Sequence, residues 1–211
     1  MPIKVFNADD HPMLRKGVTD LIKESPDLEW VGSAANGQEA IEKIRALRPE
    51  IAILDIEMPH YSGIEVAKIL LAEGTPTRFI IFTLFEDENF LRNALAVGIK
   101  GYLLKDSSET EMLAAIRTVH AGKPYVNPNL AHILSTPKTE TPPLLAKLTA
   151  HEFNILKLIA QHKTSNEIAN MLFISPKTVG NLRTKISKKL ELDGKQNALL
   201  KWVMEHKELF T

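Results

Sequence analysis

Ile51-Ala52-Ile53-Leu54 runs directly into Asp55, and this stretch decides the fold that the first half of the chain predicts. Four consecutive apolar residues, two of them β-branched, are typical of a strand buried on both faces. Comparable short runs lie at residues 3–6, 30–31, 79–82 and 101–104, and segments with helical apolar spacing separate them. The alternation predicts an α/β domain with a doubly wound, five-stranded parallel sheet.

Length and composition favour two small domains. The chain has 211 residues, with 44% hydrophobic and 25% charged residues, which is typical of a globular protein. It has no cysteine, which excludes disulfides, thiolate catalysis and cysteine-bound zinc, and its seven histidines show no metal-ligand spacing. No stretch reaches the roughly 20 apolar residues of a membrane span. We therefore expect a cytoplasmic protein.

A proline-rich segment divides the chain. Residues 123–147 hold five of the twelve prolines, and we expect a semi-extended linker there, between domains at 1–122 and 148–211. The net charge of zero conceals an excess of six negative charges in residues 1–122 and of five positive charges in residues 145–211. This asymmetry suggests a polyanionic partner for the second domain.

Polar residues follow the predicted strands where a parallel sheet gathers its ligands, at the carboxyl ends. They are Asp9 and Asp10 after the first strand, Asp55 after the third, Thr83 at the end of the fourth and Lys105 after the fifth. Each carboxylate alone could be an ordinary solvated loop residue, but the full set suits Mg²⁺, which prefers oxygen ligands. With a metal present, one carboxylate can accept a phosphoryl group while a lysine pairs with it.

These residues, in this spacing, resemble the receiver domain of two-component response regulators, a flavodoxin-like fold, over residues 1–122. The resemblance implies that Asp55 accepts the phosphoryl group from a sensor histidine kinase and that Thr83 and Lys105 bind it. It further implies a switch made by Thr83 and Tyr102. The implied Mg²⁺ ligands are Asp9, Asp10, Asp55 and the backbone carbonyl of Glu57.

Two residues near this set allow more than one interpretation. Leu84 follows Thr83 where receivers usually carry a small residue, so it either narrows access to Asp55 or points outward. His11 lies beside the acidic pair, but with Pro12 after it the favoured interpretation is the start of the first helix. The segment 100–106, Lys-Gly-Tyr-Leu-Leu-Lys-Asp, is typical of the LuxR/NarL branch.

The second half shows only helical patterns. Thr149 with Glu152 predicts a capping box at the start of its first helix, and a short helix from Ser165 to about residue 172 precedes a break at 173–174. Ser175 and Pro176 then favour the start of a longer helix. Its apolar stripe is Val179, Leu182, Ile186 and Leu190. Its other face is Lys177, Asn181, Thr184 and Lys188, with Lys185 at the flank.

Such a face is either an ordinary solvated surface or a reader of the DNA major groove, because lysines neutralise phosphates and asparagine bonds base edges. The segments 148–152, 165–169, 172–175 and 177–179 resemble the LuxR/NarL-type four-helix, helix-turn-helix DNA-binding domain. This resemblance implies a homodimer on a pseudo-palindromic DNA operator and a last helix, with Ala198, Leu199, Trp202 and Val203, that forms either the dimer contact or domain core. The predicted DNA-binding residues are Lys177, Thr178, Asn181, Thr184, Lys185 and Lys188.

Gly180 and Leu182 stand where the family commonly has lysine and histidine, which shifts the expected readout toward Asn181 and Thr184. The predicted function is a response regulator, not an enzyme, in which phosphorylation at Asp55 controls sequence-specific DNA binding and transcription. One alternative is a kinase-sequestering interaction protein with a degenerate DNA-binding domain. Another is a Mg²⁺-dependent phosphohydrolase, disfavoured because Ile56 and Glu57 next to Asp55 supply no acid–base partner of the expected kind.

Overall fold

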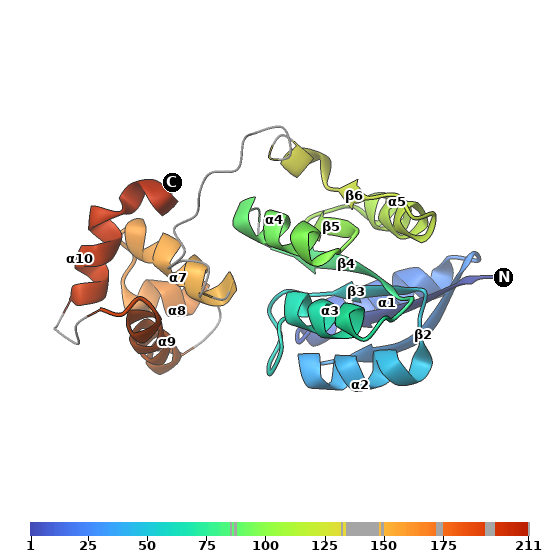
Figure 1. Cartoon of the computed structure of the whole chain (residues 1–211), viewed down its shortest axis with the longest axis horizontal. Helices are drawn as coiled ribbons and strands as arrows, with labels where there is room; N and C mark the ends of the chain where they lie inside the picture. Colours follow the sequence, from blue (N-terminus) through green and yellow to red (C-terminus); the bar gives the residue numbers. More distant parts are fainter. Residues whose placement is uncertain are drawn as a thin grey trace. The chain divides into compact units, whose positions relative to one another are not determined.

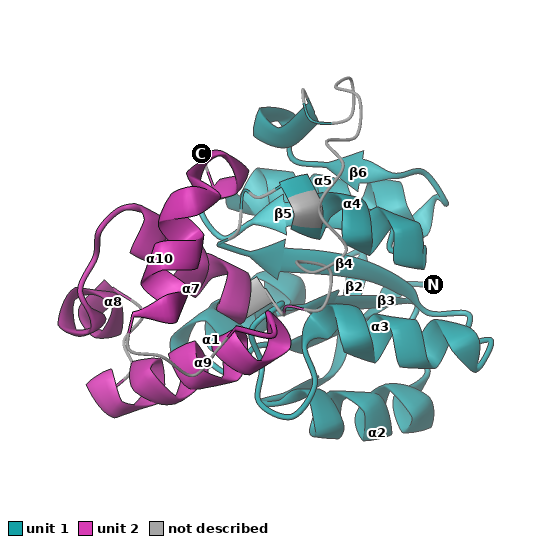
Figure 2. Ribbon diagram, turned by 60° about the vertical axis from the view of Figure 1, so that its left-hand side comes forward, with its two compact units in different colours: residues 1–137 teal, residues 138–211 magenta. Residues whose placement is uncertain are grey.

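The structure, a computed structural model, describes residues 1–84, 86, 88–131, 133, 148, 150–171, 175–192 and 197–210. The chain divides into two compact units, residues 1–137 and 138–211 (Figure 2). Most of the predicted linker, the predicted cap residue Thr149 and the break at 173–174 lie outside the described residues. Within the described part of the chain, every helix is too short or too polar to span a bilayer.

The first unit is a parallel sheet in the order β2-β1-β3-β4-β5-β6, with connecting helices on both faces (Figure 1). The strands are β1 (Ile3–Ala8), β2 (Leu28–Ala34), β3 (Ile51–Leu54), β4 (Arg78–Thr83), β5 (Gly101–Leu104) and β6 (Tyr125–Val126). The helices are α1 (Pro12–Glu24), α2 (Gly37–Leu47), α3 (Gly63–Ala72), α4 (Glu88–Val97) and α5 (Glu109–His120).

The five predicted strands and the parallel sheet are confirmed, and β6 is an addition to them. This sixth strand and the following 3₁₀ turn η1 (Pro128–Leu130) fall within residues 123–147, the segment predicted as linker. Two residues between prolines are too few to show a strand periodicity, so the sequence pattern did not reveal β6.

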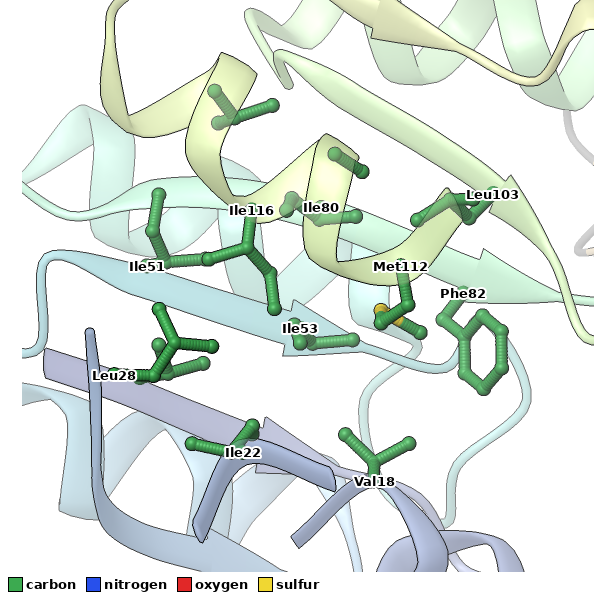
Figure 3. Close-up of a cluster of buried hydrophobic side chains, with 13 residues drawn as sticks. Val18, Ile22, Leu28, Ile51, Ile53, Ile80, Phe82, Leu103, Met112 and Ile116 are labelled. Carbon is green, nitrogen blue, oxygen red and sulfur yellow. The ribbon is translucent and has the colours of Figure 1, made fainter. Parts of the chain in front are cut away.

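The main core lies between one face of the sheet and the helices α1 and α5 (Figure 3). It includes Val18 and Ile22 from α1, Ile53 from β3 and Met112 and Ile116 from α5, all buried. All four residues of β3 are buried, as expected for a central strand covered on both faces. Burial of β3 holds Asp55, the next residue, at a fixed point of the sheet edge.

Local caps fix where the helices begin. Ser62 and Glu65 form a capping box at the start of α3, and Ser108 and Glu111 form another at α5. The prediction that His11 precedes the first helix is confirmed, since α1 begins with Pro12 at its first position. Each of these caps ends a loop at the carboxyl edge of the sheet.

The second unit is helical, as predicted. It contains α7 (Ala150–Ala160), α8 (Ser165–Met171), α9 (Pro176–Lys189), α10 (Ala198–Glu205) and a final 3₁₀ turn, η3 (Lys207–Phe210). α9 begins at the predicted cap, with the Ser175 hydroxyl accepting from the amide of Thr178 at 3.0 Å. A capping box that was not predicted, Thr164 with Glu167, precedes α8.

Leu199 and Val203 of α10 are buried in this unit, whereas Ala198 and Trp202 are half-buried. The Trp202 ring stacks on His206 and meets Phe210 edge-on. Half of the predicted apolar stripe of the last helix is therefore domain core.

Candidate functional site

The register of the sheet brings the predicted acidic site together. Ala8 pairs with Leu54, and Thr83 pairs with Leu104, so the residues that follow these strands share one edge. The backbone amide of Lys105 donates to the carbonyl of Thr83 at 2.8 Å. Residues far apart in sequence thus meet where parallel strands end, as the sequence predicted.

Lys105 is the centre of the site. Its Nζ lies 2.7 Å from Oδ2 of Asp55 and 2.8 Å from Oδ2 of Asp9. The side chains of Lys105 and Asp55 are only 4% and 3% exposed. One buried ammonium therefore bridges two buried carboxylates, and the lysine can pair with any group attached to either of them.

Burial decides the protonation of this cluster. Removal from water raises the pKa of Asp55 to about 7, with the carboxylate of Asp9 adding to the rise and Lys105 opposing it. Burial disfavours the ammonium of Lys105, but the carboxylates of Asp55 and Asp9 outweigh burial and raise its pKa. The cluster contains more carboxylate than a single lysine can neutralise.

The donor set fits a hard cation. Ligand atoms of Asp9, Asp10, His11 and Asp55 all lie within 4.8 Å of one another. Nδ1 of His11 lies 2.8 Å from Oδ1 of Asp10, while the His11 amide donates to Asp9 at 2.8 Å. Three carboxylates within this span match the oxygen ligands that Mg²⁺ takes in proteins. The acidic pocket is thus suited to a metal ion.

The other predicted site residues lie around this pocket. Thr83 is fully buried at the end of β4, and Tyr102 is fully buried within β5. The amide of Glu57, two residues after Asp55, hydrogen-bonds to the Asp55 carboxylate and lowers its pKa slightly against the larger effect of burial. Leu84 is 73% exposed, which favours the outward orientation over a plug above Asp55.

Glycines let the loop after Asp55 pack closely. A Cβ on Gly63 would lie 2.3 Å from the carbonyl oxygen of Asp55, and one on Gly37 would lie 2.0 Å from that of Tyr61. Only glycine permits such approaches of one backbone to another. These two positions fix the loop that carries Glu57.

In the second unit, α9 separates an apolar stripe from a polar face, as predicted. Val179, Ile186 and Leu190 are buried, whereas Leu182, the fourth residue of the predicted stripe, is half-buried. The six predicted DNA-binding residues are all exposed: Lys177, Thr178, Asn181, Thr184, Lys185 and Lys188. No acidic residue lies along this helix, so its exposed face presents amide, hydroxyl and ammonium groups to a polyanion.

Three of those six residues also have partners within the domain. The Thr184 hydroxyl donates to the carbonyl of Gly180 at 3.1 Å. The Thr178 hydroxyl lies 2.8 Å from the hydroxyl of the cap residue Ser175. Nζ of Lys185 lies 3.4 Å from the buried carboxylate of Glu152 on α7. The positions of Thr178 and Lys185 are therefore set by the fold before any ligand binds.

Comparison with known proteins finds one family model in each of the two units. Residues 5–117 match the response regulator receiver domain, and residues 146–201 match the bacterial regulatory proteins of the luxR family. The oxygen regulatory protein NreC of Staphylococcus aureus is 35% identical over 98% of this chain and 99% of its own length. The chain belongs to the LuxR/NarL family of response regulators.

Solved structures agree with this assignment. A LuxR-family response regulator from Aurantimonas sp. covers 64% of the present response regulator and 96% of its own chain, at 30% identity and a TM-score of 0.61. RcsB in complex with DNA is similar in fold, with 24% identity, 96% and 98% coverage of the two chains and a TM-score of 0.60. The protein is a transcriptional regulator of a two-component system and not a classical enzyme.

Sequence reasoning missed several contacts that position the response regulator's sites. Arg15 donates to the carbonyl of Asp9 at 2.6 Å, and Arg183 joins α9 to α8 through the Ser165 hydroxyl at 3.0 Å. Lys189 donates to the buried carboxylate of Glu152 at 2.6 Å. Charged residues on helices gave no signal of these partners, because the partners lie on other elements.

Proposed function

We propose that Asp55 is the phosphoacceptor and that its phosphorylation controls the binding of α9 to DNA. The observation that carries the proposal is the position of Lys105, whose ammonium lies 2.7 Å from Asp55 at the buried carboxyl edge of the sheet. A phosphoryl group attached to an Asp55 oxygen would lie beside this buried ammonium. The expected donor is a sensor histidine kinase, and the response regulator is expected to lie in the cytoplasm.

The acidic residues prepare this step. Asp9, Asp10 and Asp55, together with the backbone carbonyl of Glu57, would hold Mg²⁺. When bound, Mg²⁺ supplies positive charge that offsets repulsion between carboxylate and phosphoryl oxygens. An Asp55 oxygen forms a bond to phosphorus while the bond from phosphorus to the donor breaks and the donor keeps its electron pair.

Lys105 and Thr83 then receive the product. The ammonium of Lys105 pairs with a phosphoryl oxygen in place of an aspartate oxygen, and the Thr83 hydroxyl donates to another. Because Thr83 and Lys105 are joined through their backbones at 2.8 Å, β4 and β5 respond together. Tyr102 is buried on β5, three residues before Lys105. It is the aromatic residue expected to change position together with Thr83.

For DNA, we propose that α9 enters the major groove. Lys177, Lys185 and Lys188 neutralise phosphates, while Asn181 and Thr184 contact base edges and Thr178 supports the helix start. Active protein is expected to bind a pseudo-palindromic operator as a homodimer. Similarity in fold to RcsB, solved as a complex with DNA, supports this part of the proposal.

The test compares wild type with Asp55→Asn, each given Mg²⁺ and acetyl phosphate. Intact mass should show one added phosphoryl group in wild type only, and EDTA should abolish it. A duplex selected from a random pool by the wild-type chain should bind with an affinity that responds to this modification. Labelling of Asp55→Asn to the wild-type extent would overturn the assignment, and many turnovers of a phosphomonoester would favour a hydrolase instead.

A further inference from the structure

The segment after α5 is built onto the first unit. The amide of Tyr125 donates to the carbonyl of Lys100 and that of Asn127 to the carbonyl of Tyr102, both at 2.9 Å. Leu130 and Ile133 are buried. We call residues 125–131 together with Ile133 the clip. It begins beside β5 and lies within residues 123–147, the segment predicted as linker.

Asn127 attaches the first end of the clip to the turn that carries Lys105. Its side chain is buried, and its Nδ2 donates to the hydroxyl of Ser107 at 2.9 Å. Ser107 is held in turn by its amide, which donates to the carbonyl of Leu104 at 3.0 Å. Since Ser107 lies two residues after Lys105, a movement of that turn alters the Asn127 contact directly.

Arg92 attaches the second end of the clip to α4. One guanidinium nitrogen donates to the carbonyl of Ile133 at 2.6 Å, and another pairs with Glu88 one turn earlier on the same helix. The Arg92 side chain is 23% exposed, so this contact is partly shielded from water. Since α4 is the next helix after β4 in the chain, a movement of Thr83 at the end of β4 would displace the start of α4.

We propose that both ends of the clip respond to phosphorylation of Asp55, and that the clip transmits this change to the linker and the DNA-binding domain. This inference rests on the proposed function, in which Lys105 and Thr83 rearrange around the phosphoryl group. The turn after Lys105 holds Asn127, and the helix after Thr83 holds Ile133. The first contact of the clip therefore lies next to the turn that carries Lys105, and the second lies on the helix that follows Thr83 in the chain.

Coupling between two sites is a free energy, and each clip contact contributes to it. A single hydrogen bond contributes enough to change an equilibrium roughly two- to tenfold. Cutting either contact should therefore lower the ratio of DNA affinities, phosphorylated to unphosphorylated, by roughly two- to tenfold. Phosphorylation itself should be unaffected, because the contacts of Ser107 with Asn127 and of Arg92 with Ile133 involve none of the residues proposed to bind the phosphoryl group.

The experiment uses the full chain with Ser107→Ala and Arg92→Gln, both milder than loss of the buried Asn127. Arg117→Gln is the matched control, since Arg117 on α5 also pairs with a carboxylate, Asp27, but touches no clip residue in that contact. Three readouts are taken: intact mass for Asp55 phosphorylation, hydrogen exchange of clip peptides, and affinity for a duplex selected with the wild-type chain.

We expect normal phosphorylation, faster exchange in the clip and a reduced affinity ratio for Ser107→Ala and Arg92→Gln, with Arg117→Gln like wild type. If both clip variants are phosphorylated and retain the wild-type ratio, the clip has no role in coupling. An equal fall in the affinity ratio for Arg117→Gln would also overturn the proposed role of the clip. If wild type accepts no phosphoryl group on Asp55, the proposed function fails first, and the clip proposal falls with it.

Discussion

The buried carboxylate of Glu152 predicts an unequal response to the loss of its two lysines. Oε2 lies 2.6 Å from Nζ of Lys189, and Oε1 lies 3.4 Å from Nζ of Lys185. The Glu152 side chain is 1% exposed, Lys189 is 27% exposed and Lys185 is 61% exposed. Of these two lysines, Lys189 is thus the closer and less solvated partner of Glu152.

The magnitude follows from burial. Breaking a fully buried pair costs about 3–5 kcal/mol because one charge is left without compensation. Lys185 remains within reach of Glu152, so we expect Lys189→Met to cost about 2 kcal/mol, which is below that range. Lys185→Met removes a mostly exposed partner and should cost less than about 1 kcal/mol.

Thermal unfolding of the full chain measures the destabilisation caused by Lys189→Met and by Lys185→Met. In a small domain, about 2 kcal/mol corresponds to a fall in Tm of roughly 8–16 °C. A Trp30→Phe background leaves Trp202 as the chain's remaining tryptophan, so that its fluorescence follows the second unit. Adding Glu152→Gln to Lys189→Met should restore part of the loss, because no buried charge then remains. Equal losses from the two lysine variants would refute the assignment of Lys189 as the main partner.

Further outcomes follow from positions elsewhere in the chain. Gly180→Ala should raise the free energy of unfolding of the second unit by about 1 kcal/mol, measured by the same melts, because a Cβ there meets nothing within 4 Å. Gly63→Ala should weaken Mg²⁺ binding, measured by calorimetry, because its Cβ would press on the Asp55 carbonyl. Leu84→Ala should leave the rate of phosphoryl loss at its wild-type value in a time course of intact mass, since Leu84 faces solvent. Lys188→Ala should weaken binding to all duplexes similarly and reduce the salt dependence by about one counterion, whereas Asn181→Ala should change sequence preference in a selection.

The sequence predicted the sheet and the convergence of its polar residues because both follow from strand periodicity. Asp55 could be placed at the edge as soon as residues 51–54 were taken as a buried strand, and the register then fixed its neighbours. The faces of α9 were equally predictable, since apolar spacing alone identifies which side packs. Each of these features follows from a local sequence pattern that is compatible with one arrangement of the strand or helix.

Contacts between elements were beyond sequence reasoning. The pairing of Lys185 with Glu152 joins α9 to α7, and the contact of Arg92 with Ile133 joins α4 to the clip. The sequence around a surface lysine or arginine does not indicate which carboxylate or carbonyl on another element it contacts. The segment 123–147 was predicted as linker from its prolines, whereas its described beginning forms β6 and η1. Backbone hydrogen bonds to β5 decide that structure, and composition does not encode them.

The two ionic clusters differ in the sign of their excess charge, and this difference indicates what each attracts. Around Lys105, the carboxylates of Asp9 and Asp55 outnumber the cation, so the buried pocket is completed by added positive charge. Around Glu152, two lysines share one carboxylate, so α9 keeps a positive excess on its exposed side. The proposed metal-assisted phosphoryl site and the proposed surface for DNA phosphates therefore have charge excesses of opposite sign, in a chain whose net charge is zero.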